Sequence, residues 1–302
     1  MNTTKRPQSA EQRVVVAVLG IGTMGAAMAA NIAAAGLGLR VWNRNRDMAA
    51  PLADVGAVVC DSPAEASRGA HIILTVLANE GVVAQVMDQA REGLNENAVW
   101  LQMCTVAPEG SRRLAQQAVR LGVAYVEAPV LGTKEPAEAG ELTILAASPD
   151  VGARERVQPV LEAVGSRTVW LDEVGEPSSL KLAYNAWVLT TVEGIAESLT
   201  LADALGVDPH LVIDVIDGSR LNSVYVQTKG PKMLDDDLDA ASFPLEAAAK
   251  DAGLIADTAR AAGLRLGIAE VVRERLELAS RDGLGRADVA ATYRESRRTT
   301  TC

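Results

Sequence analysis

Three glycines follow the first apolar run at the spacing Gly20-x-Gly22-x-x-Gly25, between a β-branched run and an Ala-rich helical pattern. At such a strand-to-helix turn, the first glycine permits the bend, the second admits a pyrophosphate, and the third lets helix and strand pack closely. The helix N-terminus offers N–H groups to phosphate. The pattern predicts a dinucleotide site at these glycines, Thr23 and Met24. The alternative is a glycine-rich turn without a ligand.

The residues after the next apolar run bear on which dinucleotide binds. About 20 residues beyond the glycines, such sites normally hold an Asp or Glu that binds the ribose hydroxyl of NAD. This chain has Asn43 and Arg44 there, with Arg46 nearby. A carboxylate repels the 2′-phosphate of NADP, whereas an arginine binds it through charge-assisted hydrogen bonds. The sequence therefore favours NADP(H), with Arg46 in support; the alternative is a solvated loop arginine.

A second group able to do chemistry stands in the C-terminal half. Lys181 and Asn185 are four residues apart in a helical pattern, so both project from one helix face. A protonated lysine beside a carbonyl under reduction stabilises the negative charge growing on oxygen and donates the proton. Partial burial would bring its pKa toward neutrality. Spacing alone does not assign this role, because most Lys–Asn pairs of this kind lie on solvated surfaces.

The elements that must position these residues change character near residue 177. Before that point, continuous apolar strands alternate with helices, which is typical of a parallel sheet covered on both faces. We expect strands at 13–20, 39–43, 57–60, 71–77, 98–103, 124–130, 142–147 and 168–171. We expect only helices afterwards, at 178–206, 208–217, 244–263, 267–282 and 286–293.

The expected fold class is α/β, with an N-terminal Rossmann-type doubly wound parallel sheet followed by an all-α C-terminal domain. We place an NADP-binding domain at 13–176 and a helical substrate and dimerisation domain at 177–293, between a disordered N-terminus at 1–12 and a tail at 294–302. The first long helix has Ser178 or Ser179 as its expected cap and Gly206 as its stop, and the next begins at Asp208 and Pro209.

Charge and composition exclude several classes of protein. Acidic residues outnumber basic ones by 39 to 29, which argues against a nucleic-acid surface. The 26 uncharged residues between Arg13 and Arg40 are long enough for a membrane span, but glycines divide them into strand, turn and helix. Cys60, Cys104 and Cys302 are far apart without metal-ligand spacing. We therefore expect no metal, no disulfide and a reducing, cytoplasmic location.

Four segments resemble the β-hydroxyacid dehydrogenase family, that is, 3-hydroxyisobutyrate dehydrogenase and its relatives. They are GIGTMGAAMAANI (20–32), EAPVLGTKEPAEAGELTILAA (127–147), GEPSSLKLAYN (175–185) and FPLEAAAKD (243–251), in the family's order. The resemblance covers residues 13–293, and GTKEPAE looks most like the glyoxylate/succinic semialdehyde reductase branch. It implies reversible hydride transfer between NADP(H) and a small hydroxy acid or its aldehyde or keto form.

The resemblance also implies roles for single residues. Lys181 would carry the proton, and Asn185 would orient the lysine or the substrate. Gly132 and Thr133 would offer backbone N–H groups to a substrate carboxylate, and Thr105 would lie near the nicotinamide and the substrate. Lys250 would meet the cofactor, and Phe243 and Asp251 would help close the substrate site. The alternatives are helical-domain core for Phe243 and an ordinary solvated pair for Lys250 and Asp251.

Two positions depart from the family's pattern. Leu131 replaces a serine that helps to hold the substrate carboxylate, and a lost contact of this kind costs about 1–3 kcal/mol, roughly tenfold or more in affinity. A less polar carbonyl or an imine is therefore an alternative substrate, although imine reductases of this fold generally lack a lysine at position 181. Cys104 replaces a common serine, and its alternative is a small buried thiol.

Two further readings fit the residues less well. A catalytically silent scaffold would not need the glycine turn, Lys181 and Asn185 together, and a phosphogluconate dehydrogenase would need a longer helical domain. The pattern at 178–206 is apolar around much of its circumference, which predicts burial between the domains and pairing with another subunit. The expected partners are thus a small-molecule substrate and further copies of the chain, as a homodimer or homotetramer, with no nucleic acid and no membrane.

Overall fold

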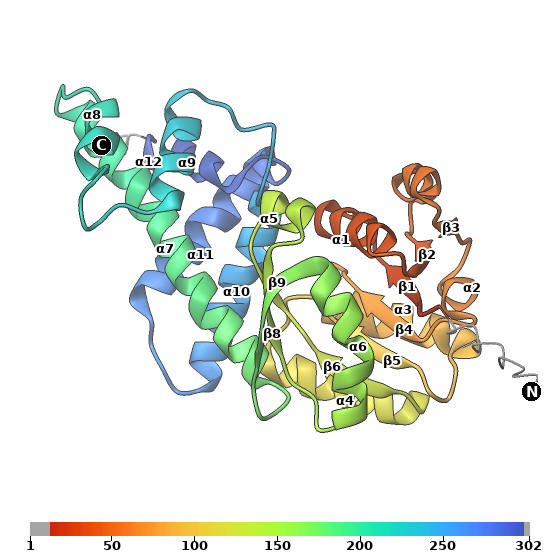
Figure 1. Ribbon diagram of the computed structural model, residues 1–302. Helices are drawn as coiled ribbons and strands as arrows, with labels where there is room; N and C mark the ends of the chain where they lie inside the picture. The colour runs from red at the N-terminus through yellow and green to blue at the C-terminus, as the bar shows by residue number, and fades with distance from the viewer. Residues whose placement is uncertain (1–12, 299–302) are drawn as a thin grey trace, which may run out of the picture.

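A six-stranded parallel sheet forms the first half of the computed structural model, which describes residues 13–298 (Figure 1). Its strands are β1 (Val15–Leu19), β2 (Gly38–Trp42), β3 (Val58–Val59), β4 (Ile72–Thr75), β5 (Val99–Gln102) and β6 (Ala124–Glu127). They lie in the order β3-β2-β1-β4-β5-β6. Successive strands are thus added on one side of β1 up to β3 and on its other side from β4 onward, so the strand order reverses between β1 and β4. Open sheets of this order bind ligands beyond the carboxyl ends of their strands at that reversal. The predicted doubly wound sheet is confirmed.

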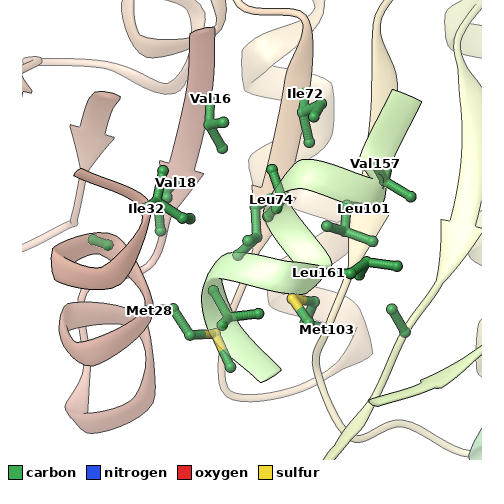
Figure 2. Close-up of a cluster of buried hydrophobic side chains, with 14 of the residues drawn as sticks. Val16, Val18, Met28, Ile32, Ile72, Leu74, Leu101, Met103, Val157 and Leu161 are labelled. Atoms are coloured by element: carbon green, nitrogen blue, oxygen red, sulfur yellow. The ribbon is translucent and has the colours of Figure 1, made fainter. Parts of the chain in front are cut away.

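Helices cover both faces of this sheet because its strands are apolar on both sides. Figure 2 shows one face, where Val16, Val18, Ile72 and Leu74 of the strands meet Met28 and Ile32 of α1 (Thr23–Ala34) and Val157 and Leu161 of α6 (Val151–Val164). The opposite face packs against α2 (Pro63–Ser67), α3 (Glu80–Ala90) and α4 (Pro108–Leu121). Short 3₁₀ helices connect the elements at Arg46–Met48, Ala50–Val55 and Arg91–Gly93.

A second, three-stranded sheet was not expected. The run at 124–130, predicted as one strand, divides into β6 and β7 (Val130–Leu131), which belong to different sheets. Pro129 stands at the break, where a residue without an N–H group cannot continue the ladder. β7 pairs antiparallel with β8 (Leu142–Ala146), and β8 pairs parallel with β9 (Gly165–Trp170); α5 (Lys134–Ala139) connects β7 to β8.

The chain from Glu176 onward forms helices joined by turns, as predicted. The 29-residue α7 (Glu176–Ala204) starts at the sheet and runs away from it, packed against several of the remaining helices (Figure 1). These are α8 (His210–Ile216), α9 (Val224–Leu234), α10 (Leu245–Ala261), α11 (Gly267–Ala279) and α12 (Tyr293–Ser296), with a π-helical turn at Ser280–Leu284 and a 3₁₀ turn at Val289–Thr292. None of these helices of the described chain combines the length and apolar character needed to cross a membrane.

Several helix ends differ from the sequence expectation. α7 begins after Gly175, so neither Ser178 nor Ser179 is its cap; the Ser178 hydroxyl instead donates to Glu127. α9 was not predicted, although the Ser223 hydroxyl caps it by accepting from the N–H of Val226. α12 extends three residues past the expected boundary at 293. The expectations for 1–12 and for 299–302 lie outside the described residues.

A buried ion pair holds the loop that leads into α10. The amine of Lys229 on α9 lies 2.7 Å and 2.8 Å from the two carboxylate oxygens of Asp288, and both side chains are buried. The same amine donates to the Ser242 hydroxyl at 2.8 Å, and Asp288 also accepts from the backbone N–H of Ser242 at 2.9 Å. The start of α10 is thereby fixed against α9 and the C-terminal segment.

Replacing this lysine should destabilise the protein strongly. Burial raises the pKa of Asp288, but the hydrogen bond and charge of Lys229, with backbone N–H donors, outweigh it and lower the pKa below 3.8. Lys229→Met leaves the carboxylate buried without its cation, so we expect a loss of about 3–5 kcal/mol in the free energy of unfolding at neutral pH. The difference from wild type should shrink as the pH falls through the pKa of the folded state.

Denaturant unfolding at several pH values measures this effect. Lys232→Met is the matched control, because Lys232 lies on the same helix and pairs at 3.0 Å with an exposed Asp237. Its loss should stay within about 1 kcal/mol. Equal losses in the two variants would contradict the assignment.

Candidate active site

The glycine turn between β1 and α1 is packed too closely for other residues. Gly20 has a φ of +107°, and a Cβ there would lie 2.1 Å from the carbonyl oxygen of Val76. A Cβ at Gly25 would lie 2.0 Å from the carbonyl oxygen of Gly20. A Cβ at Gly22 would meet nothing within 4 Å. The turn is therefore closed on the side of β4 and open at Gly22.

The open side of this turn fits the phosphates of a dinucleotide. α1 begins at Thr23 with no side-chain cap and no acidic residue in its first turn. Thr23 is exposed and Met24 half-buried. The first N–H groups of a helix have no partner within the helix, so those of α1 can donate to a pyrophosphate. These residues could hold the cofactor.

Asn43 and the two arginines after β2 have different surroundings. The Asn43 side-chain oxygen accepts from the N–H of Ile21 at 3.0 Å, and its amide donates to the Asn45 carbonyl, so Asn43 braces the glycine turn. Arg46 forms a 2.8 Å ion pair with Asp61 and is turned toward β3. Arg44 is exposed and makes no hydrogen bond or ion pair with another part of the described chain. Arg44 is thus the arginine left free to bind an anion.

Lys181 and Asn185 lie on the buried face of α7. Lys181 is 8% exposed and Asn185 is 3% exposed, so this pair does not lie on a solvated surface. Burial lowers the pKa of Lys181 from 10.5 to about 8, while the charge of Asp251 raises it and that of Lys250 lowers it. The predicted fall toward neutrality is confirmed. At this pKa, the amine can exist in both protonation states near neutral pH.

A chain of polar contacts joins this face to the sheet. The Asn185 amide donates to the Asp251 carboxylate at 2.7 Å, and the other Asp251 oxygen lies 2.9 Å from the Lys250 amine. Lys250 also donates to the backbone carbonyl of Thr105, just beyond β5, at 3.0 Å. Asp251 is 4% exposed, so the Lys250–Asp251 pair is not an ordinary surface pair. Residues from α7, α10 and the end of β5 are thus brought together.

Two tyrosines lie near the predicted substrate residues: Tyr184 is beside Lys181, and Tyr225 is within electrostatic reach of Tyr184 and Glu135. Gly132 has a φ of +128°, and the Thr133 hydroxyl donates to Glu135 at 2.9 Å. Burial raises the pKa of Tyr225 to about 12, with further contributions from the nearby Tyr184, Asp288 and Glu135. The Lys181 amine lies 6.0 Å from the centre of the Tyr184 ring. Neither tyrosine was predicted from the sequence: Tyr184 stands three residues after Lys181, a spacing that could have indicated it, whereas Tyr225 carries no local signal.

The structure also shows the burial and the contacts of three other residues that the sequence analysis singled out. Leu131 is half-buried at the end of β7. Phe243 packs against the core of the helical part, which is its alternative reading, so a closing role for it stays a prediction. The Cys104 thiol is buried, accepts from the N–H of Leu77 at 3.0 Å and donates to the Thr75 carbonyl; burial raises its pKa to about 11. Cys104 is a small buried thiol that braces the end of β4.

Curated relatives of this chain include two plant reductases. It is 30% identical over 293 residues to the chloroplastic glyoxylate/succinic semialdehyde reductase 2 of Arabidopsis thaliana, covering 96% of this chain and 81% of the relative. It is 31% identical over 279 residues to glyoxylate/succinic semialdehyde reductase 1 of the same plant, covering 91% and 96%. The crystal structure of 3-hydroxyisobutyrate dehydrogenase from Salmonella typhimurium superimposes with a TM-score of 0.84 at 25% identity, covering 93% and 99%.

Two family descriptions match nearly the whole described chain. The NAD binding domain of 6-phosphogluconate dehydrogenase matches residues 15–172. The NAD-binding region of NADP-dependent 3-hydroxyisobutyrate dehydrogenase matches residues 175–296. With the fold, the glycine turn and the buried lysine, these matches show that the chain belongs to the β-hydroxyacid dehydrogenase family, whose members are nicotinamide-dependent dehydrogenases acting on CH–OH groups.

Proposed function

We propose that this chain is an NADP-dependent reductase of a small aldehyde or keto acid, such as glyoxylate or succinic semialdehyde, with Lys181 as the proton donor. The observation that carries the proposal is the Lys181 amine, almost fully buried and with a pKa of about 8. The substrate class is supported by the plant relatives with those substrates in their names.

The residues around Lys181 divide the work of a carbonyl reduction. The nicotinamide supplies the hydride when it is bound. The protonated amine of Lys181 stabilises the negative charge that develops on the carbonyl oxygen and donates its proton to that oxygen. Asp251 accepts one hydrogen bond from the Asn185 amide nitrogen and so fixes the amide, whose oxygen can then accept from the substrate or from the lysine. In the reverse direction, the neutral amine accepts the proton.

Removing the amine should abolish most of the turnover. We expect Lys181→Met to reduce kcat roughly 10²–10⁴-fold, the usual contribution of a general acid. The wild-type rate of reduction should fall as the pH rises through about 8, because the donor must be protonated, and the rate of oxidation should rise. The measurement is loss of NADPH absorbance with glyoxylate, succinic semialdehyde and methylmalonate semialdehyde. Lys232→Met is the control, and retained turnover in Lys181→Met would sink the assignment.

The second candidate function is reduction of a less polar carbonyl or of an imine, and Leu131 is the residue that favours it. The same assay tests this candidate. Its side chain offers no hydrogen bond where the family has a serine, and it is half-buried at the end of β7. The panel therefore includes a hydrophobic aldehyde and a cyclic imine. If the enzyme reduces these compounds and none of the acids, the proposed substrate class is wrong and the protein reduces an apolar carbonyl or an imine.

Arg44 is proposed to bind the 2′-phosphate that distinguishes NADP from NAD. We expect Arg44→Ala to raise the KM for NADPH roughly tenfold to a hundredfold, the value of one or two hydrogen bonds to a charged group, and to leave the KM for NADH unchanged. Arg46→Ala is the control, because Asp61 already engages Arg46, and its effect should be smaller. An equal rise in both variants, or an equal rise for NADH, would contradict this role.

We also propose that the helical part pairs with a second copy of the chain. Leu180, Tyr184 and Trp187 follow one face of α7, and Trp187 is 72% exposed. Exposed apolar stripes of this kind mark interaction surfaces. We expect sedimentation to show a dimer or tetramer, and Trp187→Glu to shift it toward the monomer. A wild-type protein that stays monomeric at every concentration would refute the pairing.

A further inference from the structure

Glu127 is a buried, hydrogen-bonded carboxylate that has no part in the reaction described above. It ends β6, is fully buried, and lies in the sheet-containing part of the chain. One carboxylate oxygen accepts from the N–H of Gly175 at 2.6 Å. The other accepts from the N–H of Ser178 at 2.9 Å and from the Ser178 hydroxyl. A buried carboxylate is costly unless such donors surround it, so this position is built to hold one.

The helix that receives these contacts has no cap of its own. Gly175 precedes α7 with a φ of +100° and no side chain, and no local side chain bonds the free N–H groups of the first turn. The N-terminus of a helix is stabilised by a negative charge, because unpaired N–H groups and the helix dipole meet there. Glu127 supplies that charge from a strand some 50 residues earlier, through charge-assisted hydrogen bonds.

The first turn of α7, which Glu127 holds, lies next to Lys181 along the helix. Through Glu127, it is also connected to the segment of residues 131–133 predicted to bind the substrate, called here the substrate segment. Ser178 precedes Lys181 by three residues, less than one helical turn. The backbone of Glu127 exchanges hydrogen bonds with Ala147 at the end of β8, at 3.0 Å and 2.9 Å. The chain after Glu127 continues directly into Leu131, Gly132 and Thr133. One side chain therefore joins the substrate segment to the helix that carries Lys181.

We propose that Glu127 is a positioning residue that sets how deeply the first turns of α7, and with them Lys181, are held against α10 and the sheet. This inference rests on the proposed role of Lys181 in proton transfer. Glu127 acts through the helix and touches neither substrate nor cofactor. Displacement of a reacting group by even an ångström can cost a large factor in rate.

The effect of Glu127 on Lys181 is separable from direct charge. The charged groups that act on the Lys181 amine are Asp251 and Lys250, both on α10; among the described residues, Glu127 is not one of them. Burial is the largest cause of the lowered pKa of Lys181. If α7 loses its anchor and its first turns relax toward solvent, the pKa should rise toward the ordinary lysine value. The pKa of Lys181 therefore reports the position of the helix.

Glu193 provides a matched control on the same helix. It is buried, lies twelve residues after Lys181, and binds the Thr292 hydroxyl and Arg275 within the helical part. Glu193→Gln is the same chemical change at a buried carboxylate of α7. It should reduce stability without moving the first turn of the helix.

The test measures the pKa of Lys181 directly in wild type, Glu127→Gln and Glu193→Gln. The chain has six lysines, so ¹³C-lysine labelling gives few side-chain signals, and Lys181→Arg identifies the one wanted. For Glu127→Gln, we expect the pKa of Lys181 to rise by about one unit. We expect kcat to fall roughly tenfold to a hundredfold while the KM for NADPH, bound at the distant glycine turn, stays unchanged. Glu193→Gln should leave both the pKa and kcat at wild-type values.

Ser178→Ala keeps the test decisive if Glu127→Gln does not fold. It removes one of the donors to Glu127, and it should shift the pKa and kcat in the same direction by less. Unchanged pKa and kcat in the variant that folds, with only a lower melting temperature, would overturn the proposal. Because the NMR titration needs no turnover, a chain that reduces none of the carbonyls would refute the proposed function while the positioning role of Glu127 is still decided.

Discussion

The contact between Lys250 on α10 and the carbonyl of Thr105 beyond β5 is the point on which the arrangement of the site depends. The sheet offers a cofactor its glycine turn, whereas the lysine and asparagine proposed to act on the substrate belong to α7. Lys250, Asp251 and Asn185 form a continuous path from the end of β5 to the buried face of α7. A site built from two halves of a chain needs such a path, because hydride and proton must reach the same carbonyl from groups fixed in different parts of the fold.

Burial is the main reason why the amine of Lys181 can exchange a proton near neutral pH. In water, an amine with a pKa of 10.5 would rarely release its proton near neutral pH, and the environment of Lys181 reduces that pKa to about 8. Asp251 and Lys250 act on it in opposite directions, so their charges partly cancel and the low dielectric decides. Enzymes commonly tune a general acid toward the working pH in this way. The neighbouring polar groups on α7 and α10 are themselves held in place, because Asn185 is hydrogen-bonded to Asp251 and Asp251 is paired with Lys250.

Much of the fold was accessible from the sequence because its signals are local. The glycine turn, the apolar strands and the long α7 follow from spacing over a few residues, and the structure confirms them. The second sheet could not be predicted in the same way: Pro129 breaks the strand run, but the pairing of β7 with β8 depends on residues far apart in the chain. The effect of Tyr184 and Glu135 on the pKa of Tyr225 likewise has no counterpart in the sequence pattern.

The cap of α7 shows most clearly why local reasoning fails where the site is assembled. Ser178 and Ser179 stand where a capping serine is expected, yet the helix begins earlier, at Glu176. Its N-terminus is satisfied by a carboxylate from β6, so the Ser178 hydroxyl acts as a donor to that carboxylate and not as an acceptor from the backbone. A local cap would fix the start of a helix only with respect to its own chain. A cap that comes from the sheet also fixes the helix with respect to residues 131–133, and the role proposed for Lys181 on that helix depends on this second constraint.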